Sequence, residues 1–132
     1  MEMTISQQQG RVLVTVFSIQ GDIDSSTYEQ IQAQVNQTID AGARNVVFDL
    51  TQVRHMSSAG MRLLNNVFNR LRGDLPEESD EAMKKGVRDG TFKSPHVKLV
   101  NPAPRVLEVL KTTGLDIFLA IYQTVTEAVA SF

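Results

Sequence analysis

The sequence predicts an α/β domain: a mixed, mostly parallel central sheet of about five strands with four main helices. Short runs of β-branched and aromatic residues alternate with longer segments whose apolar residues recur at helical spacing. Each such alternation implies a right-handed crossover between parallel strands. The first two strand-like runs are separated only by a tight turn, which predicts an antiparallel hairpin at one edge of the sheet.

The hairpin is expected from residues 3–8 and 11–17, with Gly10 at the turn. The second run leads into residues 19–24, where a glycine and two carboxylates mark the expected end of the strand.

A first helix is expected to begin near Ser26, because Ser26 and Glu29 have the spacing of a capping box. It is expected to end at Gly42. Its predicted buried face consists of Tyr28, Ile31, Val35 and Ile39.

The nearly continuous apolar run at residues 46–50 predicts a strand covered on both faces. A second helix is expected over residues 58–72. Its buried stripe is expected to comprise Gly60, Leu64, Val67, Phe68 and Leu71, with Met61 and Leu63 at the margins.

Residues 96–101 predict the next strand, and Asn101 could cap a helix with Pro102 or Pro104 in its first turn. That helix should end at Gly114. The remaining elements are a strand over residues 116–121 and a short helix over 124–130, capped by Thr124. The predicted order is ββαβαβαβα.

A single domain over residues 1–132 is expected, interrupted by a charged insertion at residues 73–95. Within the insertion, acids precede bases between Pro76 and Lys85, which favours a short exposed helix. The rest is expected to be mobile loop.

Composition excludes several functions. The net charge is −2, from 13 basic and 15 acidic side chains with no basic cluster, which argues against a nucleic-acid groove. Cysteine is absent, which removes disulfides and thiolate metal sites. Neither a signal peptide nor a long apolar run is visible. We therefore expect a cytoplasmic protein that does not insert into a membrane.

Two unusual segments should meet at the carboxyl ends of the parallel strands, where partners and ligands of such sheets bind. One is Gly21–Asp24, and the other is Arg54–Met61. The second segment contains adjacent hydroxyls at Ser57 and Ser58, where the second helix is expected to start.

Four motifs in order resemble those of the STAS domain family, which sulphate transporter tails and bacterial anti-sigma factor antagonists share. Gly21-Asp22-Ile23-Asp24 resembles its Gly-x-Leu/Ile-Asp motif. Residues 46–53 are similar to its strand ending in Asp-Leu-Ser/Thr-x-Val. Residues 56–61 are similar to its hydrophobic-Asp-Ser-Ser/Thr/Ala-Gly-Leu/Met motif, and residues 110–115 match its Leu-x-x-x-Gly-Leu turn.

The resemblance implies a protein-binding switch of the anti-sigma factor antagonist type, with Ser58 as phosphoacceptor and Ser57 as the alternate. The unmodified form would bind an anti-sigma factor that is also a serine kinase, phosphorylation would release it, and a serine phosphatase would reset it. Ser57 stands where the family typically has Asp. The implied partner-binding residues are Gly21, Asp22, Ile23, Asp24, Met56, Ser57, Ala59, Gly60, Met61 and Leu63.

Elementary electrostatics supports such a switch. Phosphate at a helix start adds about −1.5 to −2 charge, which free backbone N–H groups and the helix dipole tolerate. The cost would fall on a docked protein. A monomer or weak dimer is expected, without cofactor, metal or enzymatic activity.

Several alternatives stay open. Ser58 could simply be an N-cap, and Met61 and Leu63 could be partly buried instead of touching a partner. The chain could be a STAS scaffold, or an accessory to a transport complex, that is never phosphorylated. Less favoured is a phosphoaspartate receiver built on Asp22, Asp24 and Asp49, which we otherwise expect to bond turn N–H groups. His55 and His96 lack metal-ligand spacing.

Overall fold

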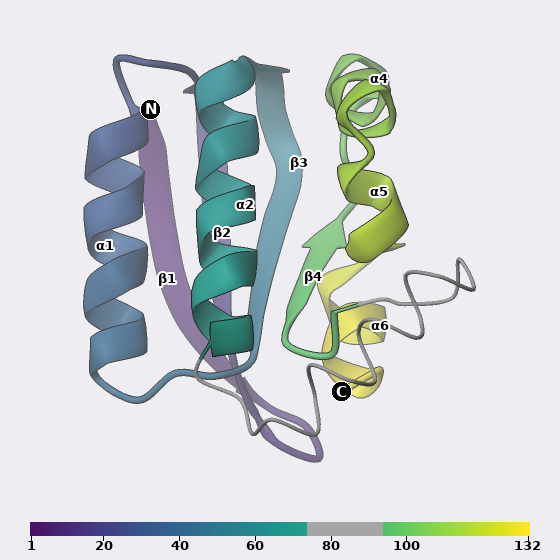
Figure 1. The fold of residues 1–132 in the computed structure, drawn as a ribbon. Helices are drawn as coiled ribbons and strands as arrows, with labels where there is room; N and C mark the ends of the chain where they lie inside the picture. Colours follow the sequence, from purple (N-terminus) through teal and green to yellow (C-terminus); the bar gives the residue numbers. More distant parts are fainter. Residues whose placement is uncertain (74–93) are drawn as a thin grey trace.

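The computed structural model describes residues 1–73 and 94–132, which build one five-stranded sheet in the order β1-β2-β3-β4-β5 (Figure 1). The strands are β1 (Glu2–Gln9), β2 (Leu13–Ile23), β3 (Val46–Met56), β4 (Val97–Val100) and β5 (Ala120–Tyr122). The helices are α1 (Tyr28–Asp40), α2 (Ser58–Gly73), α4 (Pro104–Thr113), α5 (Leu115–Phe118) and α6 (Val125–Ala130). The mixed α/β class predicted from the sequence is confirmed.

The predicted hairpin is also confirmed. β1 and β2 pair antiparallel from Glu2 opposite Gln20 to Gln9 opposite Leu13. The turn closes through a hydrogen bond from the Gly10 N–H to the Val12 carbonyl at 3.1 Å. All other strand pairs are parallel.

The two central strands extend further than the sequence suggested. β2 continues through Ile23 and β3 through Met56, and these two residues are register partners at the end of the ladder. Register shifts between Ser18 and Gln20 and between Gly21 and Asp22 let the strands stay paired over this length. Residues 21–23 and 54–56 are therefore strand, and residues 58–61 already belong to α2. The parallel pairing holds the two strand ends side by side.

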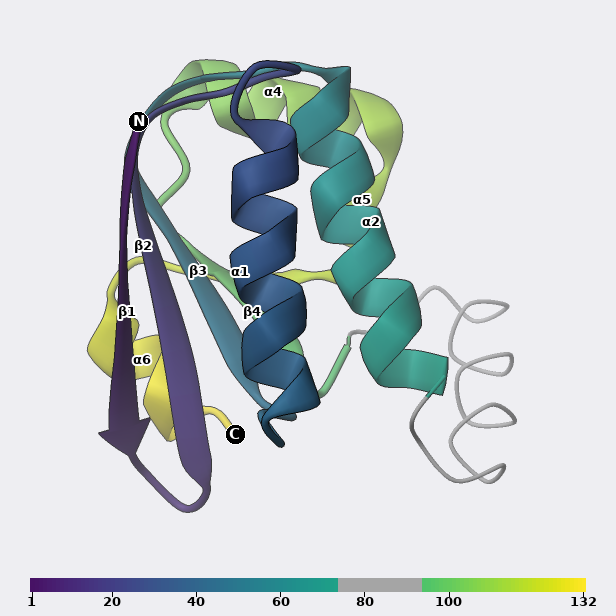
Figure 2. The ribbon, with the colours of Figure 1, turned by 90° about the vertical axis from the view of Figure 1, so that its left-hand side faces the viewer.

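The helices form two unequal layers on the sheet (Figure 2). α1, α2, α4 and α5 contribute to the larger core with Phe17, Phe48 and Leu99. α6 covers the opposite face, where a smaller core contains Val14, Val16, Val47, Val100, Ala128 and Val129. The larger core lies directly beneath α2 and fixes its position.

Lys98 of β4 forms hydrogen bonds with the residue that follows α6. Its Nζ donates hydrogen bonds to the carbonyl and hydroxyl oxygens of Ser131, at 3.0 and 2.7 Å, and lies 4.2 Å from the centre of the Phe132 ring. Burial lowers the pKa of the Lys98 ammonium, and the Tyr122 hydroxyl partly opposes this shift.

The last strand was predicted wrongly. Residues 115–118 form the short helix α5, and the strand contains only Ala120–Tyr122. Gly114 has φ 81°, which turns the chain out of α4. Leu115 and Leu119, one helical turn apart, are both buried, whereas Ile117 is exposed. The apolar residues of this segment fit a strand as well as a helix, so the sequence alone did not reveal the helical spacing of Leu115 and Leu119.

Two predicted helix caps are also wrong. The α1 N-cap is Thr27 instead of Ser26, and the Ser26 hydroxyl donates to Asp24. The α4 N-cap is Ala103 instead of Asn101, and neither α1 nor α4 has a side-chain cap bond. Pro104 does begin α4, and Thr124 caps α6 as predicted by accepting from the Glu127 N–H at 3.1 Å.

The predictions for Pro76–Lys85 and for most of the 73–95 insertion lie outside the described residues. Among the described helices, none combines the length and apolar character needed to cross a membrane.

Stability should fall in mild acid because of His96. Its half-buried ring has Nδ1 3.0 Å from the Asn45 Oδ1. Burial lowers its pKa below the ordinary 6.5, Lys98 adds to this, and a hydrogen bond with the Arg44 backbone opposes it. As pH falls, the unfolded chain therefore binds a proton at this histidine before the folded chain does. Stability is lost as pH falls from the ordinary histidine pKa toward the lower pKa of the folded chain. Denaturant unfolding between about pH 7.5 and 5.5 should show a shallower pH dependence in His96→Gln. An equal dependence in both proteins would contradict the assignment.

Candidate functional site

The candidate site lies at the pole where β2 and β3 end and α2 begins. Ile23 and Met56 are neighbours in the parallel ladder, and one residue, Ser57, separates β3 from α2. In Figure 1 the carboxyl end of β3 and the start of α2 are at the top of the molecule. The sequence analysis predicted that the partner-binding segments meet at this pole.

Ser57 joins the sheet to the helix through its backbone and side chain. Its N–H donates to the Ile23 carbonyl at 2.9 Å. Its carbonyl accepts from the Gly60 and Met61 N–H groups at 3.0 and 3.3 Å. Its Oγ accepts from the Ala59 N–H at 3.2 Å. Ser57 is therefore the N-cap of α2.

Ser58 is the first residue of α2 and is exposed. Within residues 1–73 and 94–132, its hydroxyl has no hydrogen-bond partner. The interpretation of Ser58 as the cap is wrong, because Ser57 fills that role. The first turn of α2 has no acidic residue, so no carboxylate there opposes an added negative charge.

Gly60 lets α2 approach the ends of both strands. A Cβ at this buried position would overlap the Met56 Cγ and lie 3.0 Å from the Ile23 Cγ2. Any larger residue would push the first turn of α2 away from the sheet. The glycine therefore sets the position at which Ser58 is presented.

The carboxylates of Asp24 and Asp49 bond to groups two residues further along the chain. The Asp24 Oδ1 accepts from the Ser26 N–H at 2.9 Å and from its hydroxyl at 2.6 Å. The Ser26 hydroxyl is the main cause of the lowered Asp24 pKa. Asp49 accepts from the N–H and the hydroxyl of Thr51, at 3.1 and 2.6 Å. In the described ranges no three acidic or histidine side chains gather as a metal site.

The predicted partner-binding residues divide into a surface set and a supporting set. Half-buried positions that can still meet a partner are Gly21, Asp22, Asp24, Ser57 and Ala59. Ile23, Met56, Gly60 and Leu63 are buried. The helix stripe and strand ends that carry these four residues face the core, so they support the surface from below, and their contact with a partner stays a prediction.

A groove between α2 and the turn from α4 to α5 contains residues that the sequence analysis missed. It has a volume of about 400 Å³ and is lined by Met61, Arg62, Asn65, Thr113 and Leu115. The Thr113 hydroxyl donates to the Met61 Sδ at 3.3 Å, which joins α4 to α2. Met61 is 8% exposed and so lies at the rim of the core.

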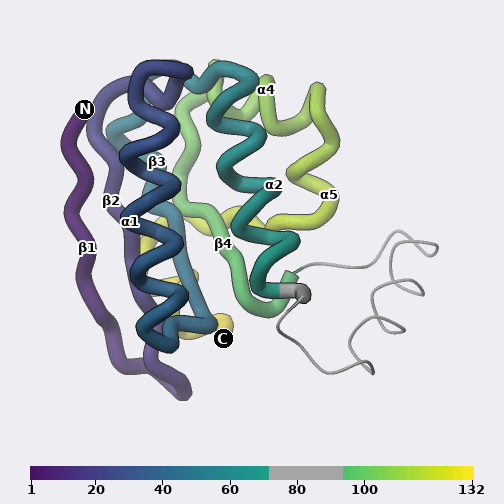
Figure 3. Tube along the Cα trace, turned by 60° about the vertical axis from the view of Figure 1, so that its left-hand side comes forward, coloured from purple at the N-terminus to yellow at the C-terminus, as the bar shows by residue number. Residues whose placement is uncertain are grey.

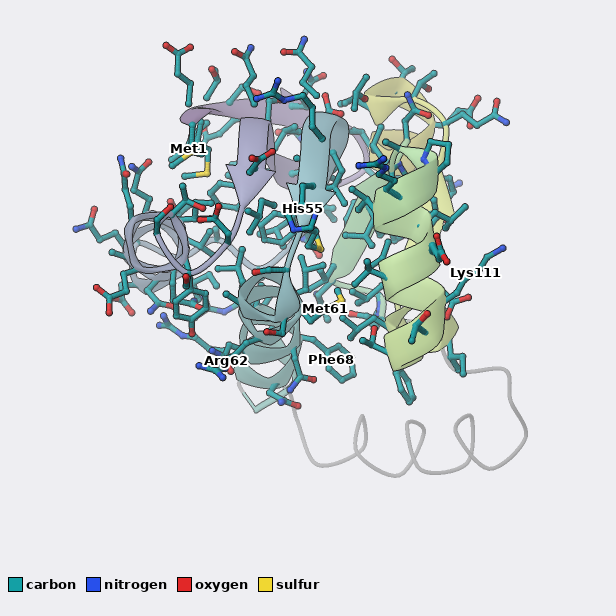
Figure 4. All side chains as sticks on the ribbon, turned by 90° about the horizontal axis from the view of Figure 1, so that it is seen from above. Met1, His55, Met61, Arg62, Phe68 and Lys111 are labelled. Carbon is teal, nitrogen blue, oxygen red and sulfur yellow. The ribbon has the colours of Figure 1, made fainter. Side chains whose placement is uncertain are left out.

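Figure 4 looks down on this pole and shows His55 close to the first turn of α2, with Arg62 extending away from the sheet. Arg62 follows Ser58 by one helical turn, so the spacing could have identified it. Thr113 and Leu115 could not have been found this way, because only the tertiary fold brings them to α2.

The family model of the STAS domain matches residues 4–74, which include both strand ends and all of the α2 first turn. The chain belongs to the STAS domain family. The matched range contains both Ser58 and Gly60.

One relative has a name from the anti-sigma factor antagonist class. BtrV of Bordetella bronchiseptica, whose name places it among the anti-sigma factor antagonists, is 33% identical over 72 residues. That match covers 54% of this chain and 60% of BtrV, so the chain spans less than two thirds of this relative.

Solved structures share the fold at lower identity. An anti-sigma factor antagonist domain protein from Planctomyces limnophilus has a TM-score of 0.69 at 22% identity, covering 96% of this chain and 93% of its own. The Bacillus cell fate determinant SpoIIAA in its phosphorylated form has a TM-score of 0.63 at 20% identity, covering 96% of each chain.

Replacing the cap should be distinguishable from replacing its neighbour. Ser57→Ala removes the bond to the Ala59 N–H and should lower the unfolding free energy by about 1 kcal/mol. Ser58→Ala removes an unbonded exposed hydroxyl and should change it by less than about 0.5 kcal/mol. Urea unfolding of both variants measures the two values. The reverse order would mean that Ser58 is the cap.

Gly60→Ala should destabilise the domain by about 1–3 kcal/mol, because the new methyl group meets Met56 and Ile23. Met56→Ala removes the overlapping atom. Adding Gly60→Ala to Met56→Ala should therefore cost less than adding it to the native chain, as a double-mutant cycle would measure. Strictly additive losses would count against this contact.

Proposed function

We propose that this domain is a phosphorylation-controlled protein-binding switch of the anti-sigma factor antagonist type. Unmodified, it binds an anti-sigma factor that is also a serine kinase. Phosphorylation of Ser58 releases the complex, and a serine phosphatase restores the unmodified form. The domain acts by binding, catalyses nothing itself, and works in the cytoplasm with its partners.

The observation that carries the proposal is the exposed Ser58 hydroxyl at the start of α2. Ser57 caps the helix, so Ser58 can be modified without loss of the cap. Both serines are adjacent, but the Ser57 Oγ is occupied by a backbone N–H and is less available to a kinase. This favours Ser58 over Ser57 as the acceptor.

Phosphate at Ser58 is compatible with the folded domain. The first turn of α2 has no acidic side chain, and Arg62 follows one turn later on the exposed surface. The helix dipole and this guanidinium favour a negative charge there. The modification therefore changes the surface and leaves the core in place.

A partner that covers Ser58 would meet the new charge directly. A dianion that must be desolvated against a docked protein can cost about 3 kcal/mol, which weakens binding about a hundredfold. The groove lined by Met61 and Leu115 begins one helical turn after Ser58 on α2 and gives the partner an apolar contact. Phosphorylation of one hydroxyl thereby controls the fraction of the domain that has a partner bound.

The relatives support the same assignment. BtrV and the Planctomyces protein have names from the anti-sigma factor antagonist class, and SpoIIAA has been solved in a phosphorylated form. Ser57 in place of the usual Asp does not remove the helix cap, because serine and aspartate both cap well. The departure therefore bears on kinase recognition and local charge, not on the fold.

The missing Asp also favours one second candidate, a STAS scaffold or accessory subunit of a transport complex that binds its partner permanently. This candidate keeps the same surface and omits the phosphate.

Phosphorylation by the kinase recovered with the domain in a pull-down distinguishes the two. Intact mass should show one phosphate on the native chain and on Ser57→Ala, and none on Ser58→Ala. An active kinase that leaves the native chain unlabelled would support the scaffold. Label retained by Ser58→Ala would place the acceptor elsewhere.

Binding should respond to charge at one position only. Ser58→Asp or Ser58→Glu should weaken affinity for the recovered partner by about tenfold or more, since one carboxylate carries less charge than a phosphate. Thr126→Asp adds the same charge at an exposed position on α6, across the sheet, and should leave affinity unchanged. Calorimetry measures both. Full affinity in a folded Ser58 variant would contradict the electrostatic mechanism.

A further inference from the structure

β1 forms an open edge of the sheet. It pairs with β2 on one side, and all of its residues except Met3 are exposed. Figure 3 shows β1 as the outermost strand of the sheet, and in Figure 1 α1, in the helix layer, lies on the same side of the molecule. Alternate backbone N–H and C=O groups along this edge have no partner strand among the described residues.

This edge lacks the features that normally prevent strand-to-strand association. The sequence of β1 is EMTISQQQ, with Glu2 as its one charged residue and no lysine or proline. Its register with β2 runs without a bulge from Glu2 to Gln9. The opposite edge strand, β5, has only three residues. β1 is therefore the longer of the two edge strands.

One apolar side chain on β1 is left partly uncovered. Ile5 stands opposite Phe17 in the antiparallel ladder, so both side chains lie on the same face of the sheet. Phe17 is fully buried in the core under the helices, whereas Ile5 is 42% exposed. A strand added along β1 would cover this side chain.

We propose that β1 pairs antiparallel with β1 of a second copy, with the two-fold axis at Ile5. A two-fold axis perpendicular to the sheet keeps the helices of both copies on the same face. Residues directly opposite each other must point to the same face, so odd-numbered residues of β1 pair with odd-numbered residues of the other copy, and even-numbered with even-numbered. With the axis at Ile5, the two Ile5 side chains meet, Thr4 pairs with Ser6 of the other copy, and Glu2 pairs with Gln8.

This register has favourable chemistry throughout. The apolar pair lies at the centre, the hydroxyl pairs flank it on the opposite face, and each carboxylate meets a neutral amide instead of its equivalent. Shifting the axis to Ser6 would place Ile5 against Gln7 and lose the apolar pair. A single strand pair is a small interface, so the dimer should be weak and concentration-dependent.

In such a dimer the two Ser58 residues lie far apart. Antiparallel pairing reverses the second copy, so the two Ser58 poles lie at opposite ends of one continuous ten-stranded sheet, five strands from each copy. Neither site is covered. Two partner molecules can therefore bind the dimer at once, far from each other.

A single cysteine tests the register directly, because the native chain has none. At the axis, the two Cα atoms at position 5 should be about 4.5–5.5 Å apart, within the usual disulfide range. Under mild oxidation Ile5→Cys should form a disulfide-linked dimer at least about tenfold faster than Leu13→Cys. Leu13 is 50% exposed, pairs with Gln9 and lies on β2, away from the axis. Equal rates would overturn the proposal.

Sedimentation of the native chain over a range of concentrations supplies a second readout. A reversible dimer is expected, and Ile5→Lys, which sets two like charges opposite each other, should raise its dissociation constant by about tenfold or more. Leu13→Lys is the matched control and should leave it unchanged. A native chain that stays monomeric, or a dimer that Ile5→Lys does not weaken, would overturn the proposal. Neither experiment involves Ser58 or its kinase, so this result is independent of the proposed function.

Discussion

The close contact between the first turn of α2 and the paired ends of β2 and β3 determines the rest of the site. Gly60 permits the contact, and the hydrogen bond from the Ser57 N–H to the Ile23 carbonyl fixes it. Because Ser57 also caps the helix, Ser58 is presented to solvent on a rigid base. Of the two adjacent serines, Ser57 therefore supports the helix and Ser58 has the accessible hydroxyl.

The sequence identified the architecture because its signals were local and agreed with one another. Four of the five residues of Val46–Leu50 are apolar and buried, α2 begins at Ser58 as predicted, and Thr124 caps α6. The pole that holds Ser58 follows from the topology of parallel strands alone. Two of the four motifs that carry the family resemblance, residues 21–24 and 56–61, lie at this pole.

The errors arose where tertiary contacts decide between local alternatives. Leu63 sits at the margin of the apolar stripe by periodicity, yet it is fully buried. Asn66 and Arg70, on the same side of α2, bond to Tyr28 and Asn36 of α1, so Leu63 is on the side that packs against α1. Ser26 has capping-box spacing with Glu29, but the Asp24 carboxylate takes its hydroxyl first. The length of β3 depends on the bulged pairing with β2, which no local pattern reveals. The groove at Thr113 joins residues 52 positions apart.

The most direct test of this account is amide hydrogen exchange, residue by residue, on the chain carrying phosphoserine at position 58. The account predicts unchanged protection of the Ser57 and Gly60 amides and of the β2–β3 ladder, with altered exchange confined to the exposed first turn of α2. Loss of protection at Ser57 or along β3 would show that the phosphate acts by unfolding the pole, and would contradict a switch that works through surface charge on an intact fold.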